Sequence, residues 1–203
     1  MAITKTLFSG TTPKANAAEI YAWMQANATE YFDSITIEGS SVKCITSGGG
    51  FISIKPEVRE WSCKLDNGGA YSIDNYSSDT SKIRVSAAYK TSKGIALVIS
   101  DEGWIFVCKS NSGSTGVLLS SYYHPGRYAF ADLAYSTKWI YDVGYDLTHI
   151  QMAMTSLAPV PLGDSGTYAD GLYFVPFYQY DNTGMISVGG KSYVYSGWAA
   201  LEE

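Results

Sequence analysis

The chain has 203 residues, enough for a sizeable core in one or two modules; 46% of them are hydrophobic and only 16% are charged. Its 14 lysines and arginines are scattered and its formal net charge is −5, which argues against a protein that holds nucleic acid by neutralising phosphates. The longest apolar run, residues 95–99, is far shorter than the ~20 residues that cross a bilayer, so we expect no membrane insertion.

The cysteines and the N-terminus indicate the compartment in which the chain folds. Cys44, Cys63 and Cys108 match neither a zinc-binding spacing nor a disulfide-rich scaffold. Cys63 and Cys108 could form a disulfide, although buried free thiols are the simpler expectation. Met1 to Lys5 do not form a charged region followed by an apolar one, so we expect no secretory signal and folding in a cytoplasm.

One amphipathic helix is expected near the N-terminus. The segment Asn16-Ala-Ala-Glu19 has the N-cap and N3 residues of a capping box. Apolar residues then recur on one face at helical spacing: Ile20, Met24, Ala28 and Tyr31. Because the stripe is one-sided, we expect the helix to lie on a sheet.

The hydrophobic period changes to two after the helix and predicts an antiparallel meander. Strands are expected over residues 35–37, 42–45 and 51–54, with turns at 39–41 and 48–50. The segment 61–81, rich in Asn, Asp, Gly and Ser, is interpreted as loop-like. Its strongest turn signal, residues 66–69, would alternatively join two short strands.

A further strand is expected over residues 83–89, and the clearest hairpin joins residues 94–100 to 104–109. Successive residues are apolar in both hairpin strands, which predicts burial on two faces, one against the core and the other against another layer or another subunit. The candidate interface residues are Ile95, Leu97, Ile99, Trp104 and Phe106.

The last third of the chain ends in a second clear hairpin. Residues 185–188 and 191–195 flank Gly189-Gly190, which suits a type I′ or II′ turn, and residues 198–201 are expected to extend the second strand. Before it, residues 111–116 are interpreted as a flexible stretch, 120–145 as helix or strand, and 150–157 as extended. The whole pattern predicts a mainly β protein, a β-sandwich or barrel-like set of antiparallel sheets with one N-terminal amphipathic helix. It forms a single module, 1–203, or alternatively divides into 1–60 and 61–203.

The motifs that could carry chemistry are weak. Gly163-Asp-Ser-Gly166 is similar to the nucleophile loop of trypsin-like proteases, and His124, Asp142 and Ser165 occur in a suitable order, but the residues around them differ from that family. Asp142, Asp146 and His149 lack the second histidine of a typical metal site. We therefore expect no catalytic, cofactor-binding or metal site and no enzyme activity.

The many tyrosines and tryptophans have two interpretations, because a large apolar ring with a polar tip suits a core as well as a ligand surface or an interface. Core packing is the simpler one. The residues that would form an exposed surface for a sugar or receptor are Tyr122, Tyr123, Trp139 and Tyr141.

The whole chain resembles small structural proteins of phages and prophages of Gram-positive bacteria. A polar start at residues 4–10 leads into one helix, a Ser/Asn/Gly-rich β region follows, and the end combines residues 173–180, 186–195 and 198–201. The resemblance implies a virion protein, tail-associated or surface-projecting, which acts in particle assembly or host attachment through its β surfaces. It also implies a homo-oligomer among other virion subunits, with a host-surface glycan as a further partner. The alternatives are a stand-alone carbohydrate-binding or adhesive module and a capsid decoration protein.

Overall fold

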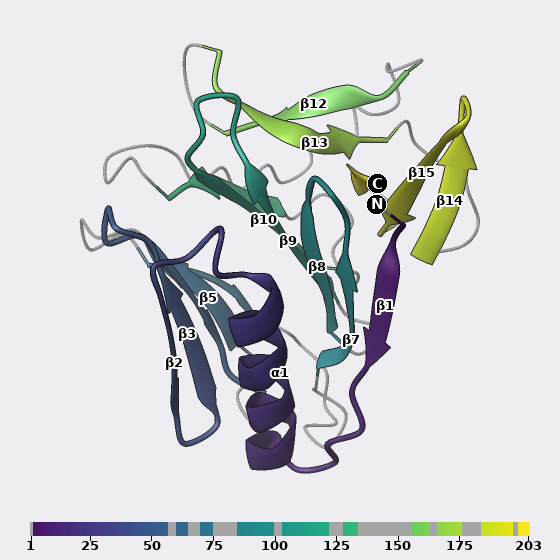
Figure 1. Ribbon diagram of the computed structural model, residues 1–203. Helices are drawn as coiled ribbons and strands as arrows, with labels where there is room; N and C mark the ends of the chain where they lie inside the picture. The colour runs from purple at the N-terminus through teal and green to yellow at the C-terminus, as the bar shows by residue number, and fades with distance from the viewer. Residues whose placement is uncertain are drawn as a thin grey trace.

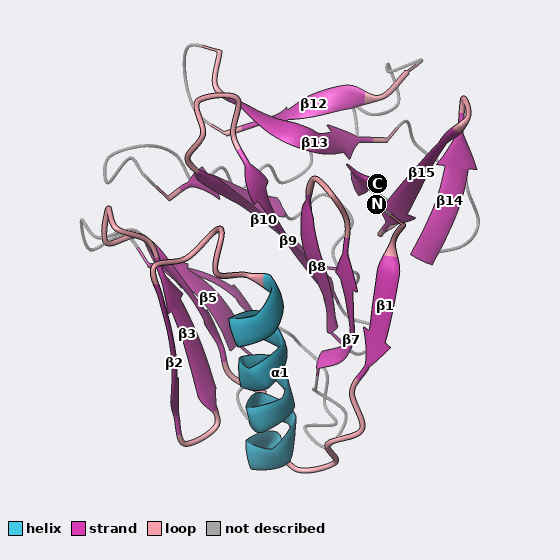
Figure 2. Cartoon of the chain, in the orientation of Figure 1, coloured by secondary structure: helices cyan, strands magenta, loops and turns pink. Residues whose placement is uncertain are grey.

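The computed structural model describes residues 2–56, 60–64, 70–74, 85–99, 103–121, 128–133, 156–162, 166–175, 184–196 and 199–203. Within these ranges the chain forms one helix and sixteen strands, arranged in three antiparallel sheets that do not close into a barrel (Figure 1 and Figure 2). The expected mainly β fold with one N-terminal helix is confirmed, and the barrel-like alternative is wrong.

The central sheet has six strands, in the order β1 (Thr4–Leu7), β7 (Val85–Lys90), β8 (Gly94–Ile99), β9 (Gly103–Lys109), β10 (Thr115–Ser121) and β11 (Tyr128–Asp132). The meander sheet has five, β2 (Ser34–Glu38), β3 (Ser41–Ile45), β4 (Phe51–Ile54), β5 (Glu60–Lys64) and β6 (Ala70–Asp74). The C-terminal sheet has the order β12 (Ala158–Pro161), β13 (Tyr168–Phe174), β16 (Ala199–Glu202), β15 (Lys191–Tyr195) and β14 (Gly184–Val188).

The meander sheet confirms the first three predicted strands and extends them. Strands β5 and β6 lie in the segment that the sequence pattern predicted to be loop-like, so that prediction is wrong for residues 61–64 and 70–74, and the alternative of two short strands is confirmed. The turn at residues 66–69 lies outside the described residues. Because β4 pairs with β5 along residues 51–54 and 61–64, one sheet runs across the alternative domain division at residue 60.

The helix α1 (Pro13–Asn27) begins three residues before the predicted N-cap. Thr12 caps it, with its hydroxyl accepting a hydrogen bond from the backbone N–H of Ala15. Asn16, the predicted cap, is fully buried in the first turns of the helix. Its side-chain amide donates to the carbonyl of Val85 and accepts from the N–H of Val85, both at 2.9 Å, so this residue joins the helix to strand β7.

The predicted apolar stripe is confirmed for Ile20 and Met24, which are buried on the helix. Ala28 and Tyr31 are buried as well, but they follow the end of the helix at Asn27, so the predicted helix is too long. On another side of the helix, Glu19 reaches back to the segment before it and accepts hydrogen bonds from Ser9 and Gly10. Burial raises the pKa of Glu19, but these bonds outweigh it, and the pKa lies below its ordinary value. In the described part of the chain, no helix is both long and apolar enough to cross a bilayer.

The hairpin of β8 and β9 is buried on both faces, as its sequence predicts, and both covering layers belong to the same chain (Figure 1). Ile95, Leu97 and Ile99 pack with the helix and the meander sheet, and they are at most 1% exposed. Trp104 and Phe106 pack against the C-terminal sheet and are at most 4% exposed. The expectation that these five residues contact another subunit is therefore corrected, because a layer of the same chain occupies that face.

Aromatic rings form a column in the core between the central and C-terminal sheets. The ring of Trp104 stacks on Tyr89 and on Phe106, with centroid distances of 5.9 and 5.7 Å. Offset stacking of this kind adds about 0.5–1.5 kcal/mol per pair beyond the burial itself. Leu162 fills the space beside Gly116, where an added Cβ would clash with its methyl group. For these aromatic residues, core packing is confirmed.

The C-terminal hairpin is confirmed, including its turn. Gly189 and Gly190 both have positive φ values, 58° and 82°, as a type I′ turn requires. The expectation that residues 198–201 extend the second strand is wrong, since Ala199–Glu202 form β16, which returns antiparallel to β15.

Two of the cysteines are buried in different cores. Cys44 packs beneath the helix, where burial raises the pKa of its thiol to about 12, and Cys108 packs against the C-terminal sheet. The side chain of Cys63 lies outside the described residues, so the structure does not test the alternative that Cys63 pairs with Cys108.

Replacement of Asn16 by Ala is expected to lower the free energy of unfolding by about 2–5 kcal/mol, because it leaves the N–H and the carbonyl of Val85 buried without their partner. Urea unfolding followed by circular dichroism measures the loss. Asn27→Ala is the matched control, since the amide of Asn27 bonds only the carbonyl of Trp23 within the helix. Equal losses in the two variants would contradict the docking role of Asn16.

Phe106→Ala is expected to lower the free energy of unfolding by about 3–5 kcal/mol, the usual cost of truncating a buried aromatic side chain. Because Phe106 packs within one chain, the loss should be the same at every protein concentration. Unfolding curves recorded over a wide range of concentrations test this, and a loss that shrinks as the concentration rises would show that Phe106 lies between subunits.

Candidate functional site

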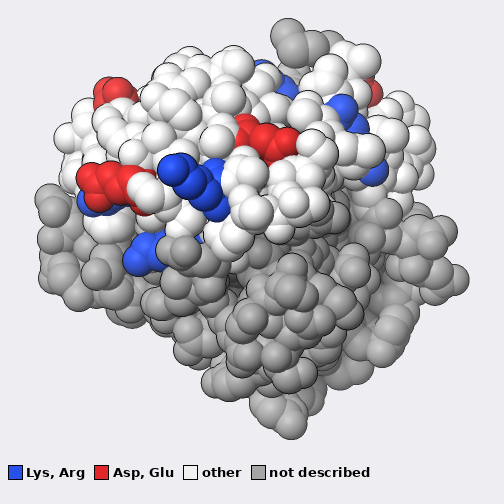
Figure 3. Space-filling view, turned by 90° about the horizontal axis from the view of Figure 1, so that it is seen from below, with Lys and Arg blue, Asp and Glu red and all other residues white. Residues whose placement is uncertain are grey.

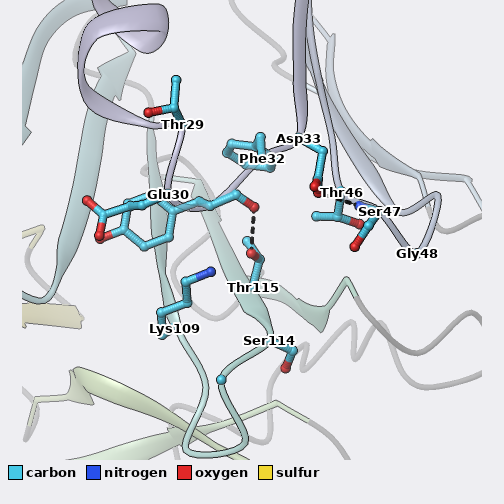
Figure 4. Close-up of a pocket in the computed structure, with 12 residues that line it drawn as sticks. Thr29, Glu30, Phe32, Asp33, Thr46, Ser47, Gly48, Lys109, Ser114 and Thr115 are labelled. Atoms are coloured by element: carbon cyan, nitrogen blue, oxygen red, sulfur yellow. Dashed lines mark hydrogen bonds between the residues drawn. The ribbon is translucent and has the colours of Figure 1, made fainter.

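A polar pocket of about 250 Å³ lies where the end of the helix, the meander sheet and the central sheet meet (Figure 4). Three segments far apart in the sequence line it: residues 29–33, residues 46–48, and the residues Lys109, Gly113, Ser114 and Thr115 of the β9–β10 hairpin. Its side chains are mainly hydroxyls and charged groups, and these make it the candidate functional site.

The wall formed by residues 29–33 is set by the way the helix ends. The N–H groups of Tyr31 and Phe32 both bond the carbonyl of Ala28, which turns the chain sharply after the helix. The rings of Tyr31 and Phe32 go into the core, 4% and 3% exposed, whereas Glu30 is exposed at the surface. The turn thus leaves polar groups and backbone facing the pocket.

Two carboxylates stand on this wall, and each is already engaged. Glu30 accepts from the ammonium of Lys90 at 2.9 Å and from the hydroxyl of Tyr31. Burial first, and then the charge of Glu30, raises the pKa of Tyr31 far above its ordinary value, so this hydroxyl keeps its proton. Asp33 accepts from the backbone N–H of Ser47 at 2.6 Å, which fastens the wall to the turn between β3 and β4.

The opposite side of the pocket is the β9–β10 hairpin, whose turn is closely bonded. The hydroxyl of Ser110 bonds those of Ser112 and Ser114 at 2.8 and 2.6 Å. Asn111 bonds the carbonyl of Gly166 and the N–H of Tyr168, so the turn is also fastened to the C-terminal sheet. These bonds fix a segment that its composition suggested to be flexible.

Thr115 joins the two sides. Its hydroxyl donates to the carbonyl of Tyr31 at 2.6 Å, and the side chain is 5% exposed (Figure 4). This bond links residues 84 positions apart, and it joins the segment after the helix to strand β10.

Lys109 is the cation of the pocket. It follows the buried strand residues of β9, and its ammonium points toward the middle of the pocket (Figure 4). The ammonium lies 5.5 Å from the centre of the Tyr31 ring. Among the described residues it forms no ion pair, so its N–H groups are available to a molecule in the pocket.

None of the candidate interface residues is among the described residues that line this pocket. Tyr122, Tyr123, Trp139 and Tyr141 lie outside the described residues. The same is true of the protease-like and metal-like residues His124, Asp142, Asp146, His149 and Ser165. In the ranges that the structure does describe, no group of three or more His, Cys, Asp and Glu side chains is placed to hold a metal ion.

Few features of the amino-acid sequence point to the pocket residues. Lys109 is the first charged residue after a run of buried strand residues, which is the one signal at its position. Thr29, Asp33 and Ser47 lie in short polar segments that look like ordinary connections. These residues come together only because the segment after the helix packs against both the meander sheet and the central sheet.

Thr115→Val is expected to lower the free energy of unfolding by about 1–3 kcal/mol, because it leaves the carbonyl of Tyr31 buried without its donor at nearly unchanged volume. Thr115→Ser keeps the hydroxyl and should cost less. Chemical denaturation of the two variants and the parent chain measures both losses, and a smaller loss for Val than for Ser would contradict the bond.

The charges elsewhere on the described surface are mixed. On the face shown in Figure 3, basic and acidic side chains lie next to one another, without a run of one sign. No protein-family model, no curated protein and no solved structure matches this chain. Its function is therefore inferred from its residues and its geometry.

Proposed function

We propose that the chain is a structural protein of a phage particle, tail-associated or projecting from the surface, which acts in assembly or host attachment through its β surfaces. The observation that carries the proposal is the outer strand β1, which is paired on one side only and has all four side chains exposed. A strand with an open edge can pair with a neighbouring subunit.

The pairing of β1 defines which backbone groups face outward. The N–H of Phe8 donates to the carbonyl of Ser86, and in an antiparallel pair the hydrogen-bonded positions alternate. Thr4 and Thr6 therefore bond toward β7, whereas Lys5 and Leu7 present their N–H and carbonyl groups to the outer edge. No described strand pairs with that edge.

Exposed apolar side chains lie on the same outer strands. Of the large hydrophobic side chains exposed in the described ranges, Leu7 on β1 is 72% exposed and Met185 on β14 is 61% exposed. Both strands approach Tyr89, since Lys5 lies over its ring at 5.4 Å and a Cβ added at Gly184 would lie 3.8 Å from its hydroxyl. An exposed apolar side chain on an outer strand is available for contact with a neighbouring subunit.

The resemblance to virion proteins supports the same proposal, because such proteins are low in charge, rich in β structure and stabilised by symmetric neighbours. The second candidate function, a stand-alone carbohydrate-binding module, is favoured by one observation, the polar pocket around Lys109. Labelling of purified phage particles with an antibody against this chain separates the two, since only the virion protein is carried by the particle.

The parent chain is expected to form oligomers in solution that Leu7→Lys/Met185→Lys weakens. Loss of two buried apolar contacts should raise the dissociation constant at least tenfold, about 1.4 kcal/mol or more. Size-exclusion chromatography with light scattering measures the mass against concentration.

Tyr168→Lys is the matched control, because Tyr168 is 43% exposed but lies on the inner strand β13. It should leave the oligomer unchanged. A parent chain that stays monomeric at every concentration, together with particles that bind no antibody, would refute the proposed function.

A further inference from the structure

The pocket around Lys109 offers hydrogen-bonding groups that the fold leaves open. The hydroxyl of Thr46 bonds the carbonyl of Gly50, and that of Thr115 bonds Tyr31, so these two are internally satisfied as donors. The ammonium of Lys109 remains open, as do the second carboxylate oxygen of Asp33 and the exposed hydroxyl of Ser47. The pocket therefore presents donors and acceptors side by side.

The charges of the lining select against a charged ligand. Lys109 contributes one positive charge, whereas Glu30 and Asp33 contribute two negative charges, of which that on Glu30 is paired with Lys90 outside the pocket. The balance is close to neutral. An anion would face two carboxylates and a cation would face the ammonium, so a neutral polar molecule fits best.

A hydroxyl group on a ligand can bond both the hydrogen-bond donors and the acceptors of the pocket. Each hydroxyl accepts from a donor such as the Lys109 ammonium and donates to an acceptor such as the Asp33 carboxylate. Bonds of this kind strengthen one another in a site that is partly shielded from water. A molecule with several neighbouring hydroxyls is therefore matched to the lining.

The volume and stiffness of the pocket limit the size of such a molecule. A space of about 250 Å³ is below the roughly 300–1,000 Å³ of sites for drug-sized ligands, and it suits one sugar ring. The walls are held by the bonds from Ser47 to Asp33 and from Thr115 to Tyr31, and by the serine cluster of the β9–β10 turn. Binding therefore requires little further ordering of the pocket residues, and little of the binding free energy is lost to it.

We infer that this pocket binds one neutral sugar unit, with Lys109 donating to its hydroxyls and Asp33 accepting from them. The inference rests on the attachment part of the proposed function, and it names the class of ligand that the protein recognises. Of the described lining residues, Tyr31 and Phe32 are aromatic, and both rings are buried, so neither offers an open face for stacking. We therefore expect a dissociation constant for a single unit of about 1 mM or weaker. Several copies in one particle would add avidity.

The test is a titration of the isotope-labelled chain with methyl glycosides of glucose, galactose and N-acetylglucosamine, followed by ¹H–¹⁵N correlation spectra. At least one glycoside should shift the amide signals of Ser47, Lys109 and Gly113. Lys109→Met should weaken that binding about tenfold or more, the effect of losing a hydrogen bond to a charged group. Ser47→Ala, which keeps the backbone bond to Asp33, should weaken it less.

Lys43→Met is the matched control, because the Lys43 ammonium also lies over an aromatic ring, that of Phe51 at 4.1 Å, but outside the pocket. It should bind the glycoside as the parent chain does. The spectra of the variants also show whether each is folded. Immobilised glycans carrying the same sugars complete the experiment, since free glycosides and the terminal unit of a glycan share this chemistry.

Three results would overturn the inference. The first is the absence of binding to the glycosides at tens of millimolar and to the immobilised glycans. The second is binding that survives Lys109→Met unchanged. The third is a Lys109-dependent shift with inorganic phosphate that no glycoside produces, which would make the pocket an anion site. None of these results bears on antibody labelling of the particle, so the sugar site and the virion assignment fail independently.

Discussion

Burial of the central hairpin on both faces is the constraint on which the architecture depends. Strands β8 and β9 place large apolar side chains on each side of the central sheet, and burying each of them contributes about 1.5–3 kcal/mol. Neither face can be left to water, so the chain supplies a layer for each. The helix with the meander sheet covers one face, and the C-terminal sheet covers the other (Figure 1).

The polar pocket is a consequence of this layering. Apolar side chains fill the space between the layers, but at their margin the chain must turn, and turns carry polar groups and backbone. Here the end of the helix, the turn between β3 and β4 and the β9–β10 turn meet at one margin. Hydrogen bonds between these segments, such as that from Thr115 to Tyr31, keep the polar pocket in a fixed shape.

The candidate contact surface and the pocket use different parts of the fold. Strand β1 adds backbone bonds to the central sheet, its side chains are exposed, and no described strand pairs with its outer edge. The segment that follows β1 is held to the helix by a hydrogen bond to the Glu19 carboxylate. The pocket lies at the C-terminal end of the helix, between the turn that joins β3 to β4 and the β9–β10 hairpin. A subunit could thus contact neighbours through one region and hold a ligand in another.

The sequence by itself determined the fold class, the helix stripe, the first hairpin and the Gly189-Gly190 turn, because periodicity and turn residues act between near neighbours. It did not determine the N-cap, since Asn16 has the residue type of a cap, yet the fold uses its amide to bind Val85. It also left open which layer covers Trp104 and Phe106. The pocket could not be predicted at all, because Asp33, Ser47 and Lys109 become neighbours only when three elements pack, and packing of distant elements is what tertiary structure alone decides.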